Sequence, residues 1–130
     1  MKLALFVIGF IFSISATAHE GHAQNPKNLK ALHGGAVKTG KEINLEYVIS
    51  GTEVKLYPVS HDGKPVPSEE IKLSATTRAA KAKKATPASL KYADNSYSFA
   101  VDFGGTHRVE VMVTTESKGK SDVFKFQVEK

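Results

Sequence analysis

Alternation of apolar and polar residues is the dominant pattern along this chain. Apolar side chains occupy every second position from Tyr97 to Phe103, and the same period of two resumes over residues 107–113. A strand with this period turns one face toward a core and the other toward water. Because Gly104-Gly105 separates the two runs, we expect them to pair as an antiparallel hairpin at the centre of the fold.

Similar short runs recur along the chain, separated by turn-forming residues. They lie at residues 42–49, 53–59, 70–77, 90–92 and 124–128. In the first of them, Glu42, Asn44 and Glu46 are expected to face solvent. About seven strands at this spacing, without a helix-period segment of useful length, are typical of a β-sandwich. We therefore predict an all-β fold, an immunoglobulin-like antiparallel β-sandwich, over residues 33–130.

The first eighteen residues have the pattern of an export signal. Lys2 precedes an apolar run from Leu3 to Phe12, and the small residues Ala16-Thr17-Ala18 fit an A-x-A cleavage site. The run is shorter than the roughly 20 residues that a membrane-spanning helix needs. We expect residues 1–18 to be a cleaved signal peptide. The mature chain would then begin at His19, without a transmembrane segment, in the periplasm or outside the cell.

Charge and composition narrow the range of functions. The 130 residues include 18 basic and 13 acidic side chains, which give a net charge of +5 with neutral histidines, and no cysteine. An excess of this size favours anionic surfaces but does not require nucleic acid, which an exported protein rarely meets. We expect no nucleic-acid partner, and without disulfides the core has to be held by burial.

Motifs that would indicate catalysis are missing from the sequence. The chain has no cysteine nucleophile, no G-x-S-x-G elbow, no H-E-x-x-H pair and no phosphate-binding glycine loop ahead of a helix. His61 and Asp62 are adjacent in a predicted turn, where both side chains are expected to be solvated. We therefore expect that the protein is not an enzyme.

Three of the five histidines lie close together near the expected mature N-terminus. His19 and His22 fall in residues 19–32, a polar segment predicted to be a flexible arm, and His33 begins a His-Gly-Gly turn. Imidazole binds copper and zinc near neutral pH, and the α-amine of His19 freed by cleavage could chelate Cu(II) together with its ring. The alternative is that these histidines are only solvated residues of a polar arm.

His107 is the fourth candidate ligand. By parity it shares a face with Val109 and Val111, which places it at the mouth of the predicted sandwich. There it could approach His33, so that His19, His22, His33 and His107 together supply a surface site for a copper or zinc ion. The alternative is a half-buried histidine whose ring bonds to a backbone carbonyl.

The most basic segment is also open to two interpretations. Lys81, Lys83 and Lys84 stand among alanines in residues 78–87. They could form a patch for an anionic surface such as lipid headgroups or polyanions. Alternatively they form a solvated loop or a lysine-protected sheet edge.

Several short motifs together resemble a known family. They are Leu32-His33-Gly34-Gly35, Glu42–Val48, Val54–Pro58 and His61–Val66. This series is similar to small immunoglobulin-like periplasmic domains that accompany heavy-metal efflux adaptor proteins of Gram-negative bacteria, in which a histidine-rich arm precedes an HGG turn. The resemblance covers His19 to Val66 and implies a periplasmic β-sandwich with a metal-related role. It carries over only His19, His22 and His33 as candidate ligands. The helical hairpin and lipoyl-like domain of an efflux adaptor are not found in this sequence, so the resemblance by itself does not imply direct coupling to transport.

Two hypotheses follow for the function. The first is an exported, periplasmic small binding protein that captures a copper or zinc ion through its N-terminal histidines. The second is a non-catalytic structural or interaction module that docks a periplasmic or envelope partner through a sheet edge or the lysine-rich segment.

Overall fold

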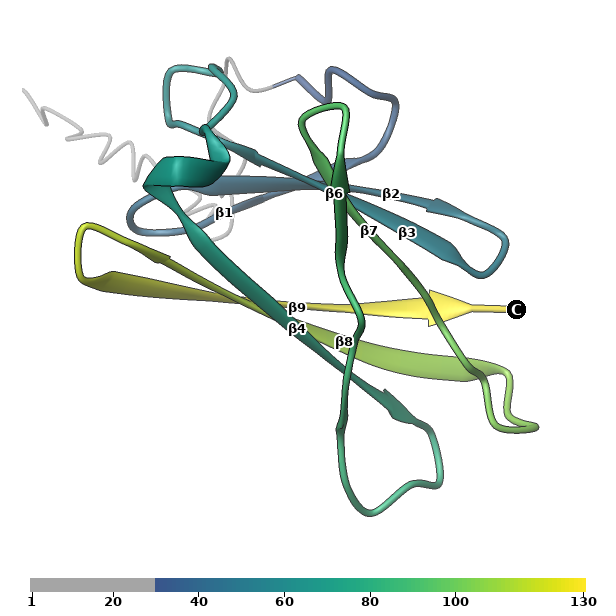
Figure 1. Ribbon diagram of the computed structural model, residues 1–130. Coiled ribbons are helices and arrows are strands. Elements are labelled where there is room, and N and C mark those ends of the chain that lie inside the picture. The colour runs from purple at the N-terminus through teal and green to yellow at the C-terminus, as the bar shows by residue number, and fades with distance from the viewer. Residues whose placement is uncertain (1–29) are drawn as a thin grey trace, which may run out of the picture.

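The computed structural model describes residues 30–130 (Figure 1). The predicted signal peptide, His19 and His22 therefore lie outside the described residues. In chain order the described elements are β1 (Ala36–Thr39), β2 (Asn44–Ser50), β3 (Glu53–Val59), the 3-10 helix η1 (Ser68–Glu70), β4 (Lys72–Ala79), β5 (Thr86–Pro87), β6 (Lys91–Ala93), β7 (Ser96–Ala100), β8 (Arg108–Ser117) and β9 (Lys120–Glu129).

The strands form two antiparallel sheets that are stacked face to face. The five-stranded sheet has the order β1-β2-β3-β7-β6, and the four-stranded sheet has the order β5-β4-β8-β9. Figure 1 shows the two layers, with β1, β2 and β3 above β4, β8 and β9. The prediction of an all-β fold is confirmed, and this arrangement is consistent with a β-sandwich. Within residues 30–130, no helix is long and apolar enough to cross a membrane.

The core lies between the two sheets and is formed by the alternate apolar positions of the strands. On β8, Val109, Val111 and Val113 are fully buried. Apolar residues of the opposite sheet pack onto them from β2, β3 and β7. Tyr47 and Phe126, from opposite sheets, stack with their ring centroids 4.0 Å apart. The predicted period of two is therefore the feature that assembles this core.

The predicted central hairpin is wrong. β7 pairs with β3 and β6 in one sheet, whereas β8 pairs with β4 and β9 in the other. The segment between them crosses from sheet to sheet, as Figure 1 shows at the right of the molecule. Val101 and Phe103 remain buried at 4% and 7% exposure because they fill the end of the core during the crossing. The alternation of inward apolar residues thus continues past the end of β7. For this reason the sequence of the crossing segment resembles one strand of a hairpin.

The remaining strands lie close to their predicted positions. Five of the predicted runs correspond to β2, β3, β4, β6 and β9, while β1 and the two-residue β5 are not among the predicted strands. The turn between β6 and β7 has Asp94 and Asn95 at φ values of 55° and 61°. Two consecutive positive φ angles are the signature of a type I′ turn between paired strands.

A buried aspartate at the start of β9 connects the two sheets. Asp122 is 6% exposed. Its carboxylate accepts hydrogen bonds from the backbone N–H groups of Lys41 and Glu42, each at 2.8 Å, and of Ile43 at 3.1 Å. These three residues lead into β2 of the other sheet. Gly40 lies so close that a Cβ there would stand 2.8 Å from the Asp122 carboxyl carbon.

Replacing Asp122→Asn should lower the free energy of unfolding by about 2–3 kcal/mol, because an amide presents only one acceptor oxygen to three donors. Urea unfolding followed by circular dichroism measures the change. Glu116→Gln, an exposed substitution on β8, is the control and should change stability by less than about 0.5 kcal/mol. Equal stabilities of the two variants would contradict the role of Asp122.

Candidate functional site

Glu46 is the centre of a polar network on the outer face of the five-stranded sheet. It lies on β2, directly opposite Val37 of β1 and Tyr57 of β3. The expectation that Asn44 and Glu46 face solvent is wrong, since they are 0% and 1% exposed. The chain segment that includes His33, just before β1, folds back over Glu46 and excludes water from it.

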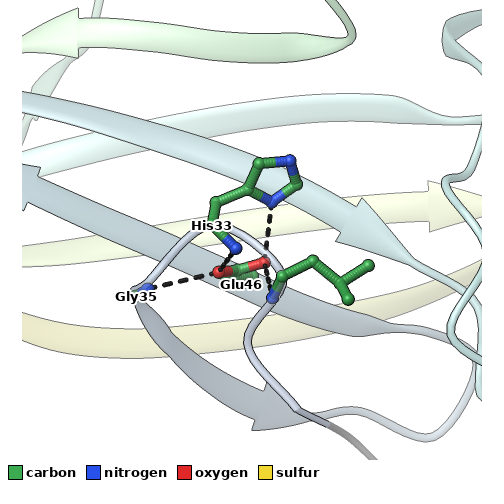
Figure 2. A network of polar contacts seen from close by, with 4 residues as sticks. His33, Gly35 and Glu46 are labelled. Atoms are coloured by element: carbon green, nitrogen blue, oxygen red, sulfur yellow. Dashed lines mark hydrogen bonds and ion pairs between the residues drawn. The ribbon is translucent and has the colours of Figure 1, made fainter.

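The Glu46 carboxylate is surrounded by hydrogen-bond donors from this segment (Figure 2). Oε1 accepts from the backbone N–H of His33 at 2.7 Å and of Gly35 at 3.2 Å. Oε2 accepts from the backbone N–H of Leu32 at 3.1 Å and lies 2.9 Å from the His33 ring nitrogen Nδ1. The His-Gly-Gly turn is therefore a loop wrapped around one buried carboxylate.

These hydrogen bonds decide the ionisation of Glu46. Burial by itself would raise the pKa of the carboxyl group, but the bonds from the His33 side chain and from the backbone N–H groups of His33, Gly35 and Leu32 outweigh it. The pKa of Glu46 is therefore lowered from its ordinary value. Donors directed at the charged form stabilise that form, so Glu46 is a carboxylate at neutral pH.

The ionised carboxylate fixes the tautomer of His33. A carboxylate can only accept, so Nδ1 carries the proton and donates it to Glu46. In the neutral imidazole Nε2 then has the free lone pair, and Figure 2 shows this second nitrogen pointing away from Glu46. The ring is also stacked on Tyr57, with centroids 3.7 Å apart and planes 7° from parallel. The result is an oriented imidazole whose side chain is 42% exposed.

A small hollow of about 130 Å³ lies beside this imidazole. Its lining includes His33, Tyr57, Asp94 and Asn95. The last two residues come from the β6–β7 turn of the same sheet. The lining thus includes the imidazole of His33 and the exposed carboxylate of Asp94, which are both ligand types for zinc and copper.

His107, the other predicted ligand among the described residues, does not line this hollow. His107 lies exposed in the crossing segment before β8, beside Arg108 and Lys130, and not on the Glu46 side of the sheet. His61 lies in the β3–η1 connection, where its Nε2 donates to the carbonyl oxygen of Gly40 at 3.0 Å. Within residues 30–130, no three His, Asp or Glu side chains are grouped closely enough to hold a metal ion. A complete site would therefore need ligands from outside this part of the chain.

Sequence reasoning identifies His33 as a candidate but misses Glu46, the residue that orients it. The strand pattern assigns Glu46 to the wet face, because period two alone does not show that a loop will cover that face. The sequence signal that could have indicated this covering loop is the His-Gly-Gly turn, because its second glycine allows the loop to lie close to β2. Gly35 does not have a positive φ, yet a Cβ there would collide with the carbonyl oxygen of Tyr47 and lie 2.8 Å from the Val48 side chain.

Replacing Gly35→Ala should therefore destabilise the protein by about 3 kcal/mol, because the colliding atom belongs to the β2 backbone and cannot rotate away. Gly34→Ala is the matched comparison. Gly34 has a φ of 76° but open space around it, so its cost should be only the roughly 1–2 kcal/mol of a left-handed residue with a Cβ. Thermal unfolding of both variants tests this order, and the reverse order would refute the close approach of the turn to β2.

Replacing Glu46→Gln should lower the free energy of unfolding at neutral pH by about 2–4 kcal/mol, since a buried charged acceptor is lost. The folded pKa lies below the ordinary value of 4.5. The stabilisation is therefore complete above that value and is lost as the pH falls through the folded pKa. Urea unfolding at a series of pH values should show wild type and variant converging in acid, whereas Glu69→Gln, on the exposed helix η1, should follow wild type throughout. If the difference in unfolding free energy between wild type and Glu46→Gln widened in acid, Glu46 would not be a stabilising carboxylate.

Comparison with known proteins assigns no family to the chain. No protein-family model, no curated protein and no solved structure matches it. The chemistry of the outer face is therefore inferred from its own residues.

Proposed function

We propose that this protein is an immunoglobulin-like periplasmic binding protein that captures a copper or zinc ion at His33, together with His19 and His22 of the N-terminal arm. The two stacked antiparallel sheets, with chain crossings between them after β3, β5 and β7, support the immunoglobulin-like class. The predicted export signal supports the periplasmic location.

One observation carries the proposal: the hydrogen bond of 2.9 Å between His33 Nδ1 and the buried Glu46 carboxylate. Metal-binding histidines usually donate their second ring N–H to a carboxylate or carbonyl, which fixes the tautomer and makes the free nitrogen a better ligand. Here the carboxylate is itself held by three backbone donors, and Tyr57 supports the ring. Nε2 is thus oriented before any metal arrives, which reduces the entropy lost on binding.

The arm supplies the ligands that the described surface lacks. His22 precedes His33 by few enough residues that the connecting chain, roughly 35 Å when extended, can return its imidazole to the hollow. The amine and ring of His19 provide two further nitrogen donors if cleavage occurs after Ala18. Asp94 is available as an oxygen ligand at the wall of the hollow. His107 is not needed, because it lies away from this surface.

The test is a titration of the exported protein with Zn(II) and Cu(II), followed by the NMR signals of the histidine side chains. The His33 Nε2 signal should shift with equimolar Zn(II) and broaden with Cu(II), while Nδ1 stays bonded to Glu46. His33→Gln should weaken binding at least 10–100-fold, the range found when oriented metal ligands or their partners are altered.

His107→Gln is the matched control, since it also removes one exposed imidazole, and it should leave the affinity unchanged. His19→Gln and His22→Gln should each weaken binding if the arm completes the site. Unshifted His33 signals in the presence of both metals would end the proposal.

A further inference from the structure

A second hollow, at the end of the molecule where β9 finishes, is lined by basic side chains from three separate segments. Its volume is about 550 Å³. Lys81 comes from the loop after β4, His107 and Arg108 from the crossing into β8, and Lys130 from the residue after β9. Glu129 is the acidic residue of the lining. Figure 1 shows the ends of β4 and β9 and the start of β8 on the same side of the molecule.

Basic side chains outnumber acidic ones in this hollow, where Glu129, opposite Arg108 on the neighbouring strand, is the one acid of the lining. Among residues 30–130, the lysines and arginines found in ion pairs are Lys55, Lys64, Arg78 and Lys120. Lys81, Arg108 and Lys130 are in no such pair, and all three are exposed. Lys83 and Lys84 extend the same charge along the loop. The excess of positive charge at this end of the molecule produces a positive potential that attracts anions.

Three backbone N–H groups at the hollow are already bonded within the protein. The N–H of Ala80 donates to the carbonyl of Arg108 at 3.1 Å, and the N–H of Lys130 donates to that of His107 at 2.9 Å. Thr106 donates both its N–H and its hydroxyl to the carbonyl of Phe103. A single phosphate ion is commonly held by convergent free N–H groups, and these three N–H groups are not free. What the hollow offers is a spread of flexible point charges, which suits many anionic groups displayed on a surface.

Nucleic acid fits this surface poorly. The residues lining the hollow include no Phe, Tyr or Trp on which bases could stack. Anionic lipid headgroups require only cations near a charged plane, and each Lys or Arg close to such a plane strengthens binding about five-fold. We propose that this end of the molecule, through Lys81, Arg108 and Lys130 with Lys83 and Lys84 beside them, docks onto a membrane surface rich in anionic phospholipid. The site lies apart from the Glu46 network, so this proposal does not depend on metal capture.

The test is sedimentation of the exported protein, which lacks the predicted signal peptide, with lipid vesicles at low salt. The protein should bind phosphatidylglycerol vesicles, should not bind phosphatidylcholine vesicles, and should be released as salt screens the charges. The triple variant Lys81→Gln, Arg108→Gln, Lys130→Gln should bind about 100-fold more weakly, at five-fold for each charge.

The matched control neutralises Lys38, Lys72 and Lys118, which are exposed and in no ion pair of the described structure. Lys38 is on β1 of the other sheet, and Lys72 and Lys118 lie at the ends of β4 and β8 opposite to the hollow. This control makes the same change in net charge and should retain most of the binding. If the triple variant does not fold by circular dichroism, Lys81→Gln and Lys130→Gln are measured singly, each with an expected five-fold loss.

Three results with vesicles would overturn the proposal, and a fourth comes from heparin. They are absence of binding to phosphatidylglycerol, an equal loss in the control triple, and displacement of the protein by inorganic phosphate at constant ionic strength. The last result would indicate a site for a free anion. Binding to heparin without binding to vesicles would also refute the lipid surface, in favour of a soluble polyanion.

Discussion

The buried carboxylate of Glu46 determines how the N-terminal segment is attached to this protein. A carboxylate on the outer face of a sheet would ordinarily be solvated, and its removal from water has a high cost unless donors replace the lost hydration. Here three backbone N–H groups and one imidazole replace it. The same contacts satisfy backbone donors that precede β1, so the loop and the charge stabilise each other. The orientation of His33, and with it the proposed chemistry, is a consequence of that balance.

Asp122 is a second buried carboxylate that fixes a loop through backbone hydrogen bonds. It too is buried and accepts hydrogen bonds from three successive backbone N–H groups. Both carboxylates bind the backbone of a loop that precedes a strand of the five-stranded sheet, and in both loops a glycine, Gly35 or Gly40, allows the backbone to approach. The sequence has no cysteine for disulfides, so these carboxylate–backbone hydrogen bonds fix loops that lie outside the apolar core.

The sequence predicts the layers of this fold better than it predicts their connections. Period-two alternation identifies β2, β3, β4 and β9 because inward residues are apolar wherever a strand faces the core. It fails between β7 and β8, where Val101 and Phe103 continue the alternation while the chain changes sheets. The alternation also fails at Glu46. It assigns this residue to the solvent-exposed face, but a loop packs over that face and buries it. His33 could be selected from its residue type and its glycines, but its partner required the tertiary structure, since thirteen positions separate them. The basic hollow combines segments far apart in the chain, so sequence reasoning found Lys81 but not its association with Arg108 and Lys130.

The crossing between β7 and β8 has a consequence for how the chain acquires its fold. Because these neighbours in sequence do not pair, β3 must find β7 and β4 must find β8 across long loops, with Glu53 opposite Ala100 and Lys72 opposite Glu116. Closing such loops costs entropy before any contact compensates for it, and topologies of this kind fold slowly. The four-stranded sheet is completed only by residues 120–129. The local pairs of β1 with β2 and of β2 with β3 can form early, whereas the two sheets can be completed only after the strands of the C-terminal half are present.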